Sequence, residues 1–327
     1  RRPVCEAQDD FVAIDAATRK NLELTQTLAG ERSGSLLSVV DRSVTAAGAR
    51  LLSRRITTPS QRLATIEERA SAVEFFCGQS GLRGAVRTDL KQLPDVERAL
   101  GRVALERSGP RDLLALGNGI AQAAQVHTLL AEQELPPLLK NAADNLKGFE
   151  ALSDELNRAL VAEPPLLARD GGFVATGYSA ELDEMTALRD EARSVIARMQ
   201  ADYAGQSEIS SLKIKHNNVL GYFIETTTTH AQRMMTAPLS DVFIHRQTTA
   251  NAVRFTTVEM GELETKILNA AGRATGLELE IFASLCALVL DHAAALQALA
   301  VSIAEIDVAA ALSELAMAEG WVRAVLN

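Results

Sequence analysis

Cationic and amide side chains gather in one stretch of the sequence, residues 205–257. Five basic and three acidic residues give this stretch a formal charge of +2, whereas the rest of the chain carries 28 basic and 39 acidic residues, a charge of −11. Three of the five histidines, His216, His230 and His245, also lie here. A mildly basic segment in a chain of net charge −9 indicates a local polyanion partner, not a surface that coats nucleic acid everywhere.

Candidates for contacts with a nucleic-acid backbone are Lys213, Lys215, Asn217, Asn218, Arg246, Asn251 and Arg254. Lys213 and Lys215 are two residues apart, so in a strand they face the same side. Arg246 and Arg254 fall in two other predicted strands, and the asparagines lie near predicted turns. Such donors suit phosphate oxygens, which position a protein without reading base sequence. The residues alone leave a second interpretation equally open, a solvated hairpin face with ordinary charges.

The segment that carries these residues changes from helical to strand-like patterning. Its β-branched and aromatic runs cover residues 211–216, 219–226, 242–248 and 253–257. Asn217 and Asn218 separate the first two runs, and asparagine tolerates the positive φ of tight hairpin turns. We therefore predict a small antiparallel β module. Its aromatic residues could stack on single-stranded bases, but packing in the core of the sheet is the favoured interpretation.

Two long amphipathic runs without proline, residues 182–203 and 258–288, flank the β module. They correspond to helices of roughly 33 Å and 46 Å. With 47% hydrophobic but only 4% aromatic residues, the chain is typical of an Ala/Leu-rich helical protein. We predict a mainly α fold in which an antiparallel helix pair carries the β insert at its far end. The alternative is two ordinary bundle helices joined by a hairpin close to the core.

The predicted domains are a helical region at 1–204, the β insert at 205–257, and a return helix with a second helical part at 258–327. A short hairpin turning at Asp170-Gly171-Gly172 is predicted before the first long helix. The apolar stretch 282–304 is interrupted by Asp291 and His292, so it indicates a buried helix instead of a membrane span. No secretory signal opens the sequence, and we expect a cytoplasmic protein without membrane contact.

Motifs for catalysis or cofactor binding are missing from the sequence. Residues 30–35 are rich in Gly and Ser but lack the lysine of a phosphate-binding loop. Cys5, Cys77 and Cys286 match no metal or redox spacing and are expected to be free thiols. The sequence therefore predicts no catalytic residues, no metal site and no cofactor in this chain.

Several motifs resemble the MutS family of DNA mismatch repair proteins, in the family's order and over almost the whole chain. The opening Asp15-Ala16-Ala17-Thr18-Arg19-Lys20-Asn21-Leu22-Glu23-Leu24 resembles the start of the family's core domain. The β module resembles the family's clamp in Leu212-Lys213-Ile214, Asn217, Gly221-Tyr222-Phe223-Ile224-Glu225, Arg246-Gln247-Thr248, Asn251-Ala252 and Arg254-Phe255. Glu259 and Glu262-Leu263-Glu264 resemble the start of the return helix.

The resemblance implies a helical core with two lever helices and a clamp inserted between them, as a fragment of a longer protein. In the family, the paired clamps of a homodimer enclose double-stranded DNA through its backbone. Separate domains read the mismatch, hydrolyse ATP with Mg²⁺ and engage a MutL-like partner, and the core transmits signals between them. The alternative is a superfamily relative that acts in recombination or another role outside repair.

Carried over residue by residue, the implied DNA contacts are strongest at Asn251 and moderate at Lys213, Asn217 and Arg246. Lys215 is this chain's own variation on the family pattern. Ala250 stands where relatives frequently have lysine, so one expected contact is missing. An alternative role for Arg246 is to tie the clamp to the ends of the lever helices.

Overall fold

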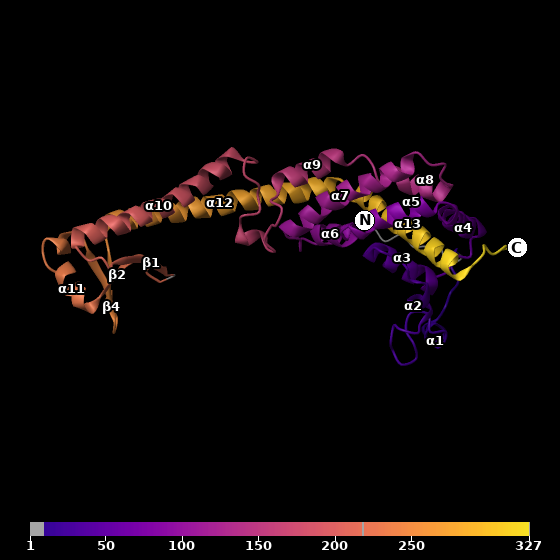
Figure 1. The fold of residues 1–327 in the computed structure, drawn as a ribbon, viewed down its shortest axis with the longest axis horizontal. Helices are drawn as coiled ribbons and strands as arrows, with labels where there is room; N and C mark the ends of the chain where they lie inside the picture. Colours follow the sequence, from indigo (N-terminus) through magenta and orange to yellow (C-terminus); the bar gives the residue numbers. More distant parts are fainter. Residues whose placement is uncertain (1–9, 218, 327) are drawn as a thin grey trace. The chain divides into compact units, whose positions relative to one another are not determined.

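The computed structural model describes residues 10–217 and 219–326, and these form two compact units. Unit 1 combines the part of the chain up to residue 166 with the part from residue 283 onward, and unit 2 comprises residues 167–282. Figure 1 shows the helices and strands of both units. The predicted mainly α fold with a small antiparallel β insert is confirmed.

Unit 1 is built around one apolar helix, α13 (Ala293–Glu319), most of whose residues between Leu296 and Leu315 are buried. Its other helices are α1 (Ala16–Asn21), α2 (Leu36–Val40), α3 (Ala46–Thr57), α4 (Leu63–Gly78), α5 (Ser80–Lys91), α6 (Val96–Ala104), α7 (Pro110–Ala131), α8 (Pro137–Asp144) and α9 (Glu150–Ala159). Helices α3, α4, α5, α6 and α8 pack on α13. Among the described helices, α13 alone has the length and composition that could span a membrane, and 67% of its most apolar window is buried inside the protein.

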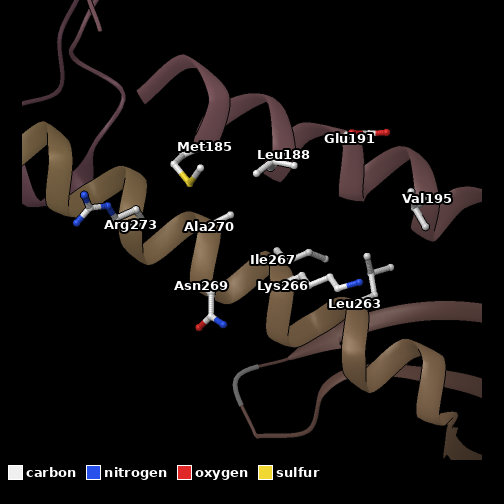
Figure 2. A pocket seen from close by; sticks show the side chains of 10 residues that line it. All are labelled: Met185, Leu188, Glu191, Val195, Leu263, Lys266, Ile267, Asn269, Ala270 and Arg273. Carbon is white, nitrogen blue, oxygen red and sulfur yellow. The ribbon is translucent and has the colours of Figure 1, made fainter. Parts of the chain in front are cut away.

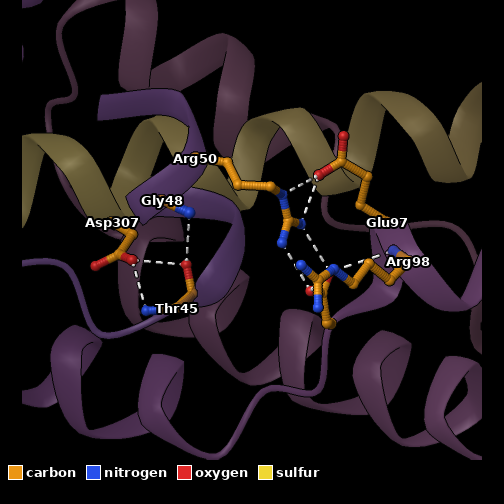
Figure 3. Close-up of polar contacts among 7 residues, drawn as sticks. Thr45, Gly48, Arg50, Glu97, Arg98 and Asp307 are labelled. Carbon is orange, nitrogen blue, oxygen red and sulfur yellow. Dashed lines mark hydrogen bonds and ion pairs between the residues drawn. The ribbon is translucent and has the colours of Figure 1, made fainter. Parts of the chain in front are cut away.

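A buried carboxylate joins α13 to the start of α3 (Figure 3). Asp307 is fully buried and accepts hydrogen bonds from the backbone N–H groups of Val44 (3.0 Å) and Thr45 (2.8 Å) and from Thr45 Oγ1 (2.6 Å). Burial raises the pKa of Asp307. A Cβ on Gly48 would lie 2.2 Å from Asp307 Oδ2, so only glycine allows this approach. Nearby, Arg50 binds Asp95 (2.8 Å) and Glu97 (2.6 Å), which hold α3 against α6.

Unit 2 contains the predicted pair of long helices, α10 (Ala180–Ser207) and the first part of α12 (Val258–Asp291) (Figure 1). Ser179 caps α10 by accepting from Leu182 N, and Thr257 Oγ1 accepts from Met260 N at the start of α12. The pair is antiparallel. Arg273 binds Glu181 (2.7 Å) near one end, and Tyr203 Oη lies 2.8 Å from Thr257 Oγ1 at the other.

Between the two helices lies a groove of about 520 Å³ (Figure 2). Its apolar lining is Met185, Leu188 and Val195 of α10 with Leu263, Ile267 and Ala270 of α12. The helices are thus joined by contacts near both ends and leave space between them in the middle.

The predicted hairpin at residues 166–175 is wrong. Residues Ala168–Asp170 form a 3-10 turn, η2, and a loop leads from it to α10. The backbone N–H groups of Gly172 (2.8 Å), Phe173 (3.0 Å) and Val174 (3.2 Å) donate to the carboxylate of Glu278 on α12 instead of to a neighbouring strand. Glu278 is only 5% exposed, and glycine at 171 and 172 provides the positive φ that turns the backbone around it.

The β module is a four-stranded antiparallel sheet of order β1-β2-β4-β3. Its strands are β1 (Lys213–Asn217), β2 (Gly221–Thr227), β3 (Ile244–Thr248) and β4 (Ala252–Thr256), and the short helices α11 (Thr228–Met234) and η3 (Leu239–Asp241) connect β2 to β3. The predicted insert, residues 205–257, begins in the last turn of α10 and ends one residue before α12.

Candidate nucleic-acid interface

One face of the sheet is the core of the β module. Ile224, Val253 and Phe255 are at most 3% exposed and pack with residues from α10, α11 and α12, among them Tyr203, Met234 and Met260. This burial fixes the sheet on the helix pair. It also supports the predicted core packing of the aromatic residues, because Phe243 and Phe255 are buried and unavailable for stacking on bases.

The opposite face carries charged side chains in register across the strands. In the backbone register, Lys213 on β1 lies opposite Glu225 on β2, and Glu225 lies opposite Arg254 on β4. Lys215 follows on the same side of β1, as its spacing predicts. Three of the seven predicted residues, Lys213, Lys215 and Arg254, therefore come together on this polar face.

Two of these cations are bound to an acidic residue between them. Lys215 Nζ lies 2.6 Å from Glu225 Oε1, and Arg254 Nε lies 3.2 Å from Glu225 Oε2. Arg254 also donates to Gln247 Oε1 (2.8 Å), and its guanidinium lies 4.6 Å from the centre of the Phe223 ring. The hydrogen bond from Lys215, followed by that from Arg254, holds the pKa of Glu225 below its usual value against the opposing effect of burial.

Lys213, Arg246 and Asn251 are the candidate residues whose side chains have no ion pair or hydrogen bond within the part of the chain that the structure describes. All three residues are exposed. Arg246 lies at a β-bulge, because the pairing of β3 with β4 shifts between His245 and Gln247. A bulge inserts an unpaired residue and re-aims its side chain. These three residues are the ones best placed to meet a ligand.

The predicted turn asparagine has a structural role. Asn217 Oδ1 accepts hydrogen bonds from the N–H groups of Val219 (2.9 Å) and Leu220 (2.7 Å), which closes the β1–β2 hairpin. Its oxygen is thus used inside the protein. Asn218, the other predicted asparagine, lies outside the described residues.

The candidate residues are divided between two ends of the sheet. Asn217 is paired with Gly221 at the start of β2, whereas Ala252, which follows Asn251, is paired with Thr227 at the end of β2. Six residues of strand separate these positions, about 20 Å at the usual rise. Asn217 and Asn251 therefore cannot contact the same phosphate, but one duplex lying along the sheet could reach both.

Sequence reasoning missed Glu225 and Glu264 as parts of this site. Glu264 on α12 accepts from Tyr222 N (3.2 Å) and approaches Gly221 so closely that a Cβ there would lie 1.7 Å from its Oε1. Pairing the predicted runs directly across Asn217-Asn218 would have set Tyr222 opposite Lys213, three residues from the observed partner Glu225, so the sequence did not place Glu225 between the cations. Contact with Glu264 depends on tertiary packing, for which the sequence contains no local signal. Among the described residues, no cluster of His, Cys, Asp or Glu could hold a metal ion.

Comparison with known proteins gives one family. The family model described as MutS domain III matches residues 17–313. The DNA mismatch repair protein MutS of Roseobacter denitrificans is 56% identical over 323 residues, and that of Paracoccus denitrificans is 58% identical over 323 residues. Each alignment covers 99% of this chain but only 37% of the relative. The MutS of Ruegeria pomeroyi is 56% identical over 321 residues, with 37% of its length covered.

Proposed function

The chain belongs to the MutS domain III family, and from this premise we propose that its β module binds the backbone of double-stranded DNA without reading base sequence, as part of a mismatch repair protein. One observation carries the proposal. Exposed cationic and amide side chains lie on the outer strands β1 and β3, at Lys213 and Arg246, and in the β3–β4 turn, at Asn251, of a sheet that has one face buried against two long helices. A rigid sheet with such donors suits phosphate contacts. The names of the relatives, all mismatch repair proteins, favour repair over recombination.

The long helices support a second part of the proposal, in which they act as lever helices that transmit the state of the clamp. Helix α12 starts one residue after the β module and is continuous from Val258 to Asp291. Hydrogen exchange of the chain with and without duplex tests this. We expect protection in the sheet and along α12, and protection confined to the sheet would contradict transmission.

The whole protein's activity is proposed from its relatives, because the chain spans about 37% of their length. We propose that the longer protein is a cytoplasmic homodimer that hydrolyses ATP with Mg²⁺ and engages a MutL-like partner. We expect no ATP hydrolysis by residues 1–327 alone. ATP hydrolysis by the purified chain would contradict the proposal that this activity belongs to another part of the longer protein.

Duplex binding by fluorescence anisotropy at several salt concentrations tests the clamp. We expect weak affinity that falls with salt, with a log–log slope of roughly −2 to −4 for a few neutralised phosphates. Lys213→Ala should make the slope shallower by about 0.9, since one phosphate contact is lost. Asn251→Ala should lower affinity without changing the slope, because its amide is uncharged.

Matched controls come from exposed positions in unit 1. Lys91→Ala removes the same charge as Lys213→Ala, and Asn118→Ala removes the same amide as Asn251→Ala. Both should leave binding unchanged. Affinity that does not depend on salt, or equal losses in the control variants, would show that the β module is not the DNA-binding surface.

A further inference from the structure

The carboxylate of Glu225 uses both of its oxygens on cations of neighbouring strands. Oε1 binds Lys215 on β1, and Oε2 binds Arg254 on β4. A DNA phosphate likewise offers two charged oxygens to lysine and arginine. Glu225 therefore occupies, within the protein, the role that a phosphate group would take between these two cations.

The exposures of the three side chains show how DNA could reach them. The Lys215 side chain is 51% exposed, whereas those of Glu225 and Arg254 are 18% and 24% exposed. Lys215 can thus turn from the carboxylate toward a ligand above the sheet. Arg254 is held more firmly, because Gln247 and the Phe223 ring also fix its guanidinium.

Glu225 also sets the charge of the polar face. Lys213, Lys215 and Arg254 carry +3 together, and Glu225 reduces this to +2. At the same time it binds the two cations that would otherwise be available. Only Lys213 of the three is left without an ion pair in the described structure.

We propose that Glu225 is a positioning residue that restrains DNA binding: it holds Lys215 and Arg254 in an internal ion-pair network, and DNA must displace it to engage them. This inference rests on the proposed function of the β module. The restraint keeps affinity for undamaged duplex low, which lets a clamp release or slide. Glu225 does not itself contact the phosphate.

The test is Glu225→Gln, which keeps the shape of the side chain but removes its charge. We expect the variant to bind duplex DNA more tightly than the native chain at low salt. The salt slope should steepen by about 0.9 for each released cation that meets a phosphate. Between about 200 mM and about 50 mM salt, the gain should therefore grow about threefold per cation. Adding Lys215→Ala to this variant should remove most of the gain.

A charge-matched control is Asp241→Asn, which removes an acidic group from the same module, where no ion pair of Asp241 is found in the described structure. An equal gain from this control would overturn the proposal, as would unchanged or weaker binding by Glu225→Gln. Independently of how that variant folds, Lys215→Ala in the native chain should weaken binding less than Lys213→Ala, because Lys215 is already engaged. An equal or greater loss would also overturn it.

The failure of this inference differs from the failure of the proposed function. If the native chain binds duplex DNA with salt dependence and Glu225→Gln brings no gain, only the role of Glu225 is wrong. If neither protein binds, the proposed DNA-binding function and this inference both fail.

Discussion

Gly221 is the position at which the β1–β2 hairpin is most sensitive to one added methyl group. Its φ is +66°, in the left-handed region that favours glycine, and a Cβ would lie 1.7 Å from Glu264 Oε1. Glu264 is held there by the hydrogen bond from Tyr222 N (3.2 Å). Gly221→Ala must therefore strain the backbone and also expel the carboxylate that fixes β2 to α12.

The two effects can be estimated separately. Left-handed backbone costs an alanine roughly 1–2 kcal/mol. Loss of a hydrogen bond to a charged group costs about 1.5–3 kcal/mol. Together the two effects amount to about 2.5–5 kcal/mol. We therefore expect Gly221→Ala to lower the free energy of unfolding of unit 2 by about 3–4 kcal/mol, near the middle of this combined range.

Denaturant unfolding followed by near-UV circular dichroism of tyrosine measures the effect. All three tyrosines, Tyr178, Tyr203 and Tyr222, lie in unit 2, whereas the single tryptophan, Trp321, lies in unit 1. Tyrosine dichroism thus follows unit 2, and tryptophan fluorescence follows unit 1. Gly221→Ala should shift the first transition and leave the second in place.

A double-mutant cycle with Glu264→Ala separates strain from contact. Once Glu264 is truncated, Gly221→Ala should cost only the backbone strain, roughly 1–2 kcal/mol. Gly261→Ala is the control, because a Cβ there meets nothing within 4 Å and alanine favours the helix by about 1 kcal/mol. If Gly221→Ala costs the same with and without Glu264, the carboxylate contact is not the reason for glycine.

Three further predictions concern the helix pair and the polar face. Glu278→Ala leaves the three backbone N–H groups of residues 172–174 without their acceptor and should destabilise unit 2 by about 3 kcal/mol in denaturant unfolding. The control is Glu280→Ala, an exposed position two residues further along α12, which should change stability by less than about 0.5 kcal/mol. Ala270→Leu places apolar atoms in the groove between α10 and α12. It should increase the free energy of unfolding by up to about 2 kcal/mol and so raise the thermal midpoint. A lower midpoint would show that the groove cannot accept the larger side chain. Glu225 has a pKa below its ordinary value of 4.5, so its ion pairs stabilise the protein above that pH and are lost as the pH falls through the lowered pKa. In urea titrations at several pH values, Glu225→Gln should therefore reduce the fall in the free energy of unfolding at acid pH. An unchanged pH profile would contradict the ion-pair assignment.

The sequence predicted the elements that have a local signal. The periodic apolar residues of 182–203 and 258–288 gave the two long helices, and Asn217 gave the β1–β2 turn, for which its side chain accepts two backbone hydrogen bonds. The helix α11 was missed because its seven residues, beginning Thr228-Thr229, contain too little periodicity to distinguish them from a loop.

Contacts between distant residues could not be predicted in this way. The hairpin expected at Asp170-Gly171-Gly172 failed because its amides bind Glu278, more than a hundred residues further along. Arg254 looked available for DNA, yet Glu225 and Gln247 hold it. Counting charges along a sequence gives the net sign of a surface but not which charges are already paired.

The bulge at Arg246 also affects whether the sheet associates with other copies of the protein at high concentration. In the order β1-β2-β4-β3, the two outer strands are β1 and β3, and backbone groups on an outer edge can add strands from other molecules. On β1 one of these groups, the N–H of Ile214, already donates to Gln200 Oε1 of α10 (2.8 Å). Lysine side chains on β1 and a bulge with an arginine on β3 are features that discourage such pairing. The cations that we assign to DNA therefore also guard against aggregation, and removing them together should yield a protein that self-associates through its edges.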